Sequence, residues 1–199
     1  MPVDSKLVKA LRDKTNAGVM NCREALEKNN CDLVRAEEWI REKGMADADK
    51  KADRATKQGL VGTYIHLNGK GGAMVELCCE SDFVARGDDF QALLRDICQQ
   101  VYAMSPRWVA RTDVPAKVVE DLKSLWANEL EGKPPEIAEK ILAGKLEKKL
   151  YSQDVLLDQM FVKDQEHPRT VGELIKSKIA VIKENIVVRR FARFEIGAQ

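Results

Sequence analysis

The apolar positions of residues 1–44 recur at helical spacing in three short runs. Asp4 or Ser5 can cap the first run, the second lies near Val19–Lys28, and the third follows Asp32 and ends at Gly44. Each predicted helix is shorter than the roughly 12 to 15 residues that an isolated helix needs for stability. We therefore expect the three helices to pack together as one compact domain over residues 1–44.

Residues 45–58 lack this pattern, because alanine and charged side chains replace the larger apolar ones. A segment of this composition has too little apolar surface to join a core and is typical of a solvated connection. We expect a charged linker between the three-helix domain and the rest of the chain.

From Gly59 the apolar positions alternate with period two, which is typical of strands. The segment Asn68-Gly69-Lys70-Gly71-Gly72 predicts a tight turn, because Asn and Gly tolerate positive φ. The pattern therefore predicts a hairpin over residues 60–80, whose return strand buries Val75, Leu77 and Cys79. A further strand is expected over residues 186–196.

Helical spacing returns between the hairpin and the last strand, with starts near Asp88, Pro115, Pro134 and Thr170. One hairpin, one late strand and several helices predict an α+β fold, in which helices cover a small antiparallel sheet. We expect this core domain to span residues 59–199.

The charge of the chain is nearly balanced, with 33 basic and 32 acidic residues among 199. Nucleic-acid binding usually needs a basic excess, so we expect no nucleic acid as the main partner. No apolar run approaches the roughly 20 residues of a membrane span, and no targeting segment is evident. The five cysteines have no framework-like spacing, which indicates reduced thiols and a cytoplasmic protein.

Motifs for catalysis, metal or cofactor binding are absent from the sequence. It contains no phosphate loop, no dinucleotide fingerprint and no Cys-x-x-Cys pair, so we expect no cofactor and no metal. The histidines, His66 and His167, are better explained as structural or exposed residues than as catalytic partners of a cysteine. A cysteine-dependent enzyme remains an alternative, although we expect the protein not to be an enzyme.

Three arginines interleave with two phenylalanines in the last strand, which is one pattern found in RNA-binding surfaces. Strand alternation instead places Arg190 on one face and Arg189 and Arg193 on the other. A sheet strand with ion pairs at its outer positions explains this arrangement more simply. An RNA-binding or ribosome-associated protein stays as the second alternative.

The segment Ser81–Gly87 joins the return strand of the hairpin to a helix, a position where functional loops often lie. It places the carboxylate of Asp82 beside the large aromatic side chain of Phe83. From chemistry alone, Phe83 is better explained as an anchor in the core, because core aromatics are common.

Three separated segments, which together span nearly the whole chain, resemble the elongation factor Ts family. The first comprises Leu7-Val8-Lys9-Ala10-Leu11-Arg12, Thr15-Asn16-Ala17-Gly18-Val19-Met20, Cys22 and Ala25-Leu26. The second is Cys79-Glu80-Ser81-Asp82-Phe83-Val84-Ala85-Arg86, in which a serine replaces the family's usual threonine. The third comprises Pro135-Glu136-Ile137-Ala138-Glu139-Lys140-Ile141, Gln159-Met160-Phe161-Val162, Thr170-Val171-Gly172-Glu173-Leu174 and Arg190-Phe191-Ala192-Arg193-Phe194-Glu195-Ile196-Gly197.

The resemblance implies a ubiquitin-associated-like fold for the three-helix domain and a nucleotide exchange function for the protein. The implied partner is elongation factor Tu, from which GDP is released so that GTP can bind. The matching positions for insertion near the magnesium and phosphate end of the nucleotide site are Ser81, Asp82, Phe83 and Val84. The matching N-terminal positions for contact with the same GTPase domain are Leu11, Arg12, Val19 and Met20.

The length of the chain adds one expectation to this resemblance. Longer members of the family have two core subdomains, whereas this chain holds material for one. By resemblance to short members, we expect a homodimer that serves two GTPase molecules, with a second contact to elongation factor Tu through the core domain.

Overall fold

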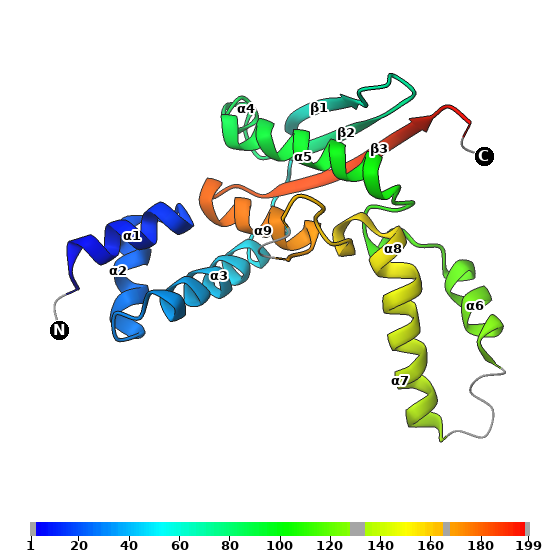
Figure 1. Ribbon diagram of the computed structural model, residues 1–199, viewed down its shortest axis with the longest axis horizontal. Coiled ribbons are helices and arrows are strands. Elements are labelled where there is room, and N and C mark those ends of the chain that lie inside the picture. The colour runs from blue at the N-terminus through cyan, green and yellow to red at the C-terminus, as the bar shows by residue number, and fades with distance from the viewer. Residues whose placement is uncertain (1–2, 128–133, 165–167, 198–199) are drawn as a thin grey trace. The chain divides into compact units, whose positions relative to one another are not determined.

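The computed structural model describes residues 3–127, 134–164 and 168–197 and confirms an α+β fold. Three strands form one antiparallel sheet: β1 (Gln58–Ile65), β2 (Gly71–Cys79) and β3 (Ile186–Glu195). The strand order is β1-β2-β3, so the return strand of the hairpin is central (Figure 1). The predicted hairpin and late strand are therefore confirmed, including the buried side chains of Val75, Leu77 and Cys79.

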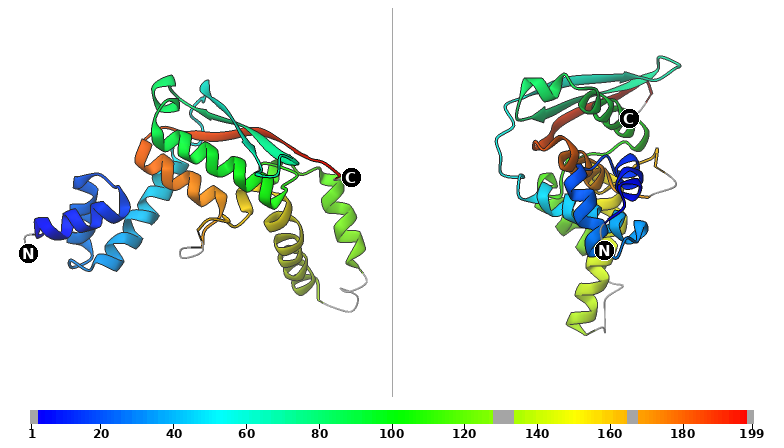
Figure 2. Two further views of the ribbon diagram at one scale, coloured as in Figure 1. Left: turned by 45° about the horizontal axis from the view of Figure 1, so that its top comes forward. Right: turned by 90° about the vertical axis from the view of Figure 1, so that its left-hand side faces the viewer.

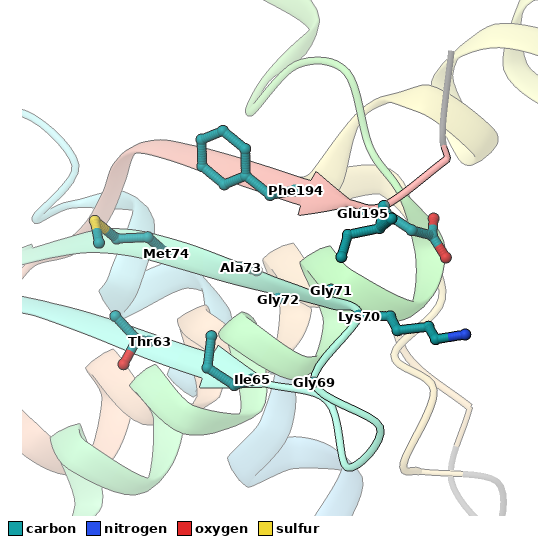
Figure 3. A pocket seen from close by; sticks show the side chains of 11 residues that line it. Thr63, Ile65, Gly69, Lys70, Gly71, Gly72, Ala73, Met74, Phe194 and Glu195 are labelled. Carbon is teal, nitrogen blue, oxygen red and sulfur yellow. The ribbon is translucent and has the colours of Figure 1, made fainter.

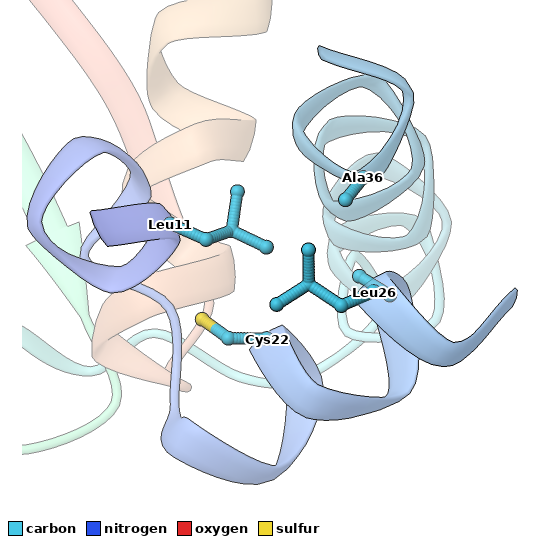
Figure 4. Close-up of a cluster of buried hydrophobic side chains, with 5 residues drawn as sticks. Leu11, Cys22, Leu26 and Ala36 are labelled. Carbon is cyan, nitrogen blue, oxygen red and sulfur yellow. The ribbon is translucent and has the colours of Figure 1, made fainter. Parts of the chain in front are cut away.

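The N-terminal segment forms three helices: α1 (Ser5–Thr15), α2 (Val19–Lys28) and α3 (Leu33–Asp49). The Asp4 carboxylate accepts a hydrogen bond from the Lys6 amide, and the Asp32 carboxylate caps α3 in the same way. Amphipathic spacing brings one face of each helix into a shared core (Figure 4). The fully buried members of this core are Leu11, Cys22, Ala25, Leu26 and Ala36.

The prediction that Gly44 ends the third helix is wrong, because α3 continues to Asp49. Gly44 does not have the positive φ of a helix-ending glycine. It instead lies against α9 (Val171–Ile182), where a Cβ added at Gly44 would come within 2.9 Å of the Ala180 Cβ. An ion pair of 2.7 Å between Lys176 and Asp49 continues this packing. The first residues of the predicted linker are therefore helical.

Spatial contacts group the chain into two compact units, each made of three separate stretches of sequence. Unit 1 comprises residues 1–60, 78–93 and 173–187, and unit 2 comprises residues 61–77, 94–172 and 188–199. The long helix that follows the β1–β2 hairpin, α5 (Asp88–Met104), contributes its first residues to unit 1 and its remainder to unit 2. Figure 2 shows this helix running along one face of the sheet.

The unit 1 core outside the three N-terminal helices is built from the start of α5, from α9 and from the start of β3. Phe90 is fully buried, as are nearly all of Leu174, Ile179 and Ile186. A 2.7 Å ion pair between Lys178 and Asp89 joins α9 to α5 at the surface of this core.

Unit 2 carries a helical hairpin made of α6 (Ala116–Leu125) and α7 (Pro135–Leu146), which lie side by side (Figure 1). The chain continues from α7 through a π-helical turn, Glu147–Tyr151, into the short helix α8 (Ser152–Asp154). At this end of the hairpin, the Arg111 guanidinium donates to Glu147 at 2.7 Å and to Asp158 at 2.6 Å.

Two buried glutamines link the inner part of unit 2. The Gln100 side chain donates to the Gln159 side chain at 3.2 Å, and the Gln159 side chain donates to the carbonyls of Met104 and Gln153. The Gln100 amide oxygen accepts from the Val162 amide at 3.0 Å. Since both side chains are fully buried, these bonds replace the water that the amide groups lose on folding.

Candidate partner-binding site

The predicted segment at the end of β2 forms a tight turn and one short helix, α4 (Asp82–Ala85). Ser81 is the N-cap of α4, and its hydroxyl oxygen accepts a hydrogen bond from the Val84 amide at 3.3 Å. The chain then turns at Gly87 and enters α5. We call Ser81–Val84 the tip.

Phe83 is exposed at the tip, with 83% of its surface accessible. Its neighbour Ala85 is buried and anchors the short helix, while Val84 is half-buried. The interpretation of Phe83 as a core anchor is therefore wrong. The turn points the aromatic ring away from the core, where it is available to a partner.

Asp82 is also exposed, and its carboxylate pairs with the Arg86 guanidinium at 2.8 Å. This pair spans one turn at the surface, where water weakens the attraction to well under 1 kcal/mol. The Asp82 carboxylate can therefore exchange Arg86 for a donor on a partner at little cost.

Ser81 is held by the carboxylate of Glu184, a residue between α9 and β3 that sequence analysis did not identify. The Ser81 amide donates to Glu184 Oε2 at 2.9 Å, and the Ser81 hydroxyl donates to Glu184 Oε1 at 2.6 Å. The carbonyl of Ser81 accepts from the thiol of Cys79 at 3.1 Å. Burial, with a smaller contribution from the Glu184 charge, raises the pKa of Cys79 to about 11 and keeps the thiol neutral.

The preceding residue, Glu80, is held by the same loop. The backbone amide nitrogen of Asn185 donates to Glu80 Oε1 at 2.7 Å, and the Arg54 guanidinium lies 3.4 Å from the same oxygen. The Asn185 side chain is only 3% exposed and donates to the carbonyls of Ala52 and Arg54. The only sequence signal for these contacts is the polar pair Glu184-Asn185 directly before a predicted strand. Sequence spacing alone does not show which residues this pair contacts.

The predicted N-terminal residues lie where α1 meets α2. Arg12, Val19 and Met20 are exposed, and Met20 is 73% accessible. Leu11 differs, because it is fully buried in the three-helix core. The structure therefore gives Leu11 a packing role behind this patch, and a direct contact of Leu11 with a partner is not supported. We call Arg12, Val19 and Met20 the N-terminal patch.

A second apolar surface lies in unit 2, on one face of the sheet. The hairpin prediction did not anticipate that the apolar positions of β1 would be exposed. They join residues from β2 and β3 around an open hollow of 440 Å³ (Figure 3). The exposed apolar side chains that line it are Ile65, Met74, Phe194 and Ile196. We call these four residues the open sheet face.

The remaining candidate groups have structural partners. The His66 ring stacks on Tyr102 with 4.8 Å between centroids, and its Nδ1 lies 3.1 Å from the Tyr64 hydroxyl. Arg190 pairs with Glu76 at 2.6 Å, as expected for ion-paired positions of a strand. His167 lies outside the described residues.

Neither a membrane-spanning helix nor a metal-binding cluster is present among the described residues. None of the described helices is both long enough and apolar enough to cross a membrane. Within the same residues, no cluster of three or more His, Cys, Asp or Glu side chains could hold a metal ion.

A family model for elongation factor Ts matches residues 33–198, which include the tip, the Glu184–Asn185 loop and the open sheet face. The chain belongs to the elongation factor Ts family. It is therefore placed among translation elongation factors that act in protein biosynthesis. The N-terminal patch lies outside the span of the family model.

Individual relatives extend the similarity over the N-terminal helices. Elongation factor Ts of Coprothermobacter proteolyticus is 49% identical over 199 residues, which is 99% of this chain and 100% of that protein. Elongation factor Ts of Fervidobacterium nodosum is 48% identical over the same shares. Elongation factor Ts of Thermosynechococcus vestitus is 48% identical over 98% of this chain and 66% of its own length. The family thus contains both chains of this length and longer ones.

Proposed function

We propose that this chain binds elongation factor Tu in its GDP form and promotes the release of GDP, so that GTP can bind. In this proposal the tip enters the GTPase near the magnesium and phosphate end of the nucleotide site. The observation that carries it is the exposure of Phe83 at the end of an anchored turn. An inserted ring can hold GTPase elements apart, while the Asp82 carboxylate bonds to donors of the shifted arrangement.

The energetics of exchange explain why such a tip is useful. A GTPase that binds GDP with nanomolar affinity holds it by about 12 kcal/mol, so spontaneous release is slow. By reciprocity, a protein that weakens GDP binding must itself bind more weakly when GDP is present. The exchange factor therefore needs a broad interface that favours the nucleotide-free GTPase. It needs no covalent step, cofactor or metal of its own.

The N-terminal patch supplies a second part of this interface in the proposal. Val19 and Met20 present exposed apolar side chains, and Arg12 adds an exposed positive charge near the end of α1. Exposed apolar residues at a helix start are available for contact without any rearrangement. A further contact with elongation factor Tu through the core domain completes the proposed interface.

The open sheet face supports a homodimer. Solvent-exposed apolar side chains on neighbouring strands favour burial against another surface, and two copies of one sheet face can pack as a sandwich. A twofold arrangement would bury the same residues from both copies. The dimer then presents two tips, one for each of two GTPase molecules.

Release of fluorescently labelled GDP from elongation factor Tu, followed by stopped flow with and without this protein, tests the proposal. We expect strong acceleration by the wild type. Phe83→Ala should lose about 2 kcal/mol of binding to the nucleotide-free GTPase, as is typical of a buried aromatic anchor. Unchanged acceleration by Phe83→Ala would contradict the role of the tip, and no acceleration by the wild type would contradict the function itself.

A further inference from the structure

The connection between α9 and β3 consists of three polar residues, Lys183, Glu184 and Asn185. Lys183 has a φ of 70°, a left-handed conformation that is uncommon for a residue with a side chain. Its amide still donates to the Ile179 carbonyl at 2.9 Å, so this residue ends the helix and redirects the chain. Glu184 and Asn185 follow at once and contact the β2–α4 turn.

Two consecutive residues of this connection hold two consecutive residues of the turn. Glu184 binds Ser81, and Asn185 binds Glu80. The paired residues are 103 and 105 positions apart in the chain. All four lie in unit 1, together with the tip.

We propose that Glu184 is a positioning residue for nucleotide exchange, which fixes Ser81 and thereby presents Phe83 in the geometry that a GTPase can accept. This inference rests on the exchange function proposed above. Glu184 does not itself reach a partner in this scheme, because its carboxylate is occupied by the Ser81 amide and hydroxyl.

The hydrogen bonds of Ser81 explain how Glu184 acts on the tip. A serine hydroxyl has one hydrogen to donate, and here Glu184 takes it. This leaves the hydroxyl oxygen free to accept from the Val84 amide, which starts α4. Glu184 therefore selects the rotamer of Ser81 that caps the helix carrying Phe83. Bonds to an ionised carboxylate are roughly twice as strong as neutral ones, so this selection is firm.

A four-residue helix cannot supply this order by itself, because a helix of that length is unstable in isolation. The remaining support also comes from outside the turn. Asn185 holds Glu80 through its amide nitrogen, and its buried side chain fixes the carbonyls of Ala52 and Arg54. The tip is thus rigid because a distant loop clamps its base, and rigidity lowers the entropy lost when Phe83 inserts.

The substitution Glu184→Gln tests the inference, because glutamine keeps the size of the side chain but offers one acceptor in place of two. We expect the rate of labelled-GDP release from elongation factor Tu to fall on the order of tenfold, the effect of about 1.4 kcal/mol. Glu184→Asp keeps the charge but is one methylene shorter, and its rate of GDP release should lie between those of the wild type and Glu184→Gln. Asp89→Asn is the matched control, since it removes a carboxylate from the ion pair with Lys178 without contact to the tip.

A double-mutant cycle with Phe83→Ala separates positioning from a general loss of structure. If Glu184 acts through Phe83, adding Glu184→Gln to Phe83→Ala should change the rate less than twofold, because the ring it positions is already gone. Fully additive effects of the two substitutions on the rate would overturn the inference. So would a wild-type rate for Glu184→Gln together with a reduced rate for Phe83→Ala. Either outcome would leave the exchange function intact. A wild-type rate for Phe83→Ala would instead contradict the proposed role of the tip.

Folding is checked on the same variants by urea unfolding. Should Glu184→Gln prove unfolded, Glu184→Asp carries the same cycle with Phe83→Ala. If Glu184→Asp lowers the rate of GDP release by the same factor in Phe83→Ala as in the wild type, Glu184 does not act by positioning Phe83.

Discussion

Each of the two units exposes one phenylalanine, but the two side chains are prepared for different kinds of contact. Phe83 in unit 1 stands on a single turn whose base is clamped by Glu184 and Asn185. Phe194 in unit 2 is 73% exposed and lies among other apolar side chains of a sheet face. A lone ring on a fixed turn suits insertion between elements of a partner, whereas a row of apolar side chains suits burial against another flat surface.

Buried amides stabilise both units, and removing them should give the largest effects. Gln159→Ala would remove one of the two acceptors of the Gln100 amide, deprive the carbonyls of Met104 and Gln153 of their donor and open a cavity, at a cost of about 4 kcal/mol. Asn185→Ala would leave the carbonyls of Ala52 and Arg54 unsatisfied, at a cost of about 3 kcal/mol. Urea unfolding of the two variants measures both costs.

Release of GDP can be measured with the same two variants at a temperature where both stay folded. Only Asn185→Ala should slow release, because the loss of its side-chain bonds to Ala52 and Arg54 loosens the loop whose backbone amide holds Glu80 at the base of the tip. Equal slowing by Gln159→Ala would mean that the tip depends on stability in general rather than on the clamp.

Each unit also holds a buried thiol, and alkaline pH should weaken both. Burial is the main cause that raises the pKa of Cys79 in unit 1 and of Cys98 in unit 2 to about 11, from an ordinary value of 9.0. The folded protein keeps these thiols neutral to higher pH than the unfolded chain does. Their contribution to the free energy of unfolding is therefore fully present below pH 9.0 and is lost towards pH 11. Each should contribute on the order of 2 kcal/mol.

Free energies of unfolding measured between pH 8 and 11 for wild type, Cys79→Ala and Cys98→Ala check this expectation. Each variant should lose less stability over this range than the wild type, because one thiol no longer ionises on unfolding. A wild-type slope in both variants would show that other groups set the alkaline limit.

The two phenylalanines provide the most direct contrast. Phe83→Ala should lower exchange by about 2 kcal/mol and leave the monomer–dimer equilibrium unchanged. Phe194→Ala should raise the dimer dissociation constant about 30-fold, again about 2 kcal/mol, without altering the tip. Any exchange deficit of Phe194→Ala should disappear at protein concentrations above that constant.

Sedimentation velocity over a dilution series, combined with the stopped-flow assay, separates the two effects. A monomeric wild type would remove the dimer from the proposal and leave the role of Phe83 standing. A dimer that dissociates in Phe83→Ala would mean that the tip, rather than the open sheet face, joins the two copies.

Local patterns in the sequence were sufficient for the elements but not for the long-range contacts. Asp32 caps α3, and period-two spacing predicts Val75 and Leu77 as buried, because these features depend on neighbouring residues alone. Composition could not reveal that Phe83 is exposed, since an aromatic residue is usually buried. Its orientation depends on the clamp by Glu184, which lies more than a hundred positions away.

The same limit applies to the candidate site. Family resemblance gave Leu11 the same role as Met20, although only Met20 reaches the surface. Spacing alone does not settle the place of Met20, because which apolar positions of α2 face the core depends on where α1 and α3 pack. The division into a domain, a linker and a core domain remains a prediction.

Two helix glycines, one in each unit, give the smallest and most local contrast. A Cβ at Gly44 would lie 2.9 Å from the Ala180 Cβ, whereas a Cβ at Gly144 in α7 would meet no described atom within 4 Å. Replacing glycine by alanine in a helix gains up to about 1 kcal/mol when there is room. Gly144→Ala should therefore stabilise unit 2 by roughly 0.5 to 1 kcal/mol, while Gly44→Ala should destabilise unit 1 by about 1 kcal/mol, because α3 and α9 must move apart. Stabilisation by both substitutions would mean that α3 packs against α9 loosely enough to accommodate a methyl group. The packing of α3 against α9 would then not require glycine at position 44.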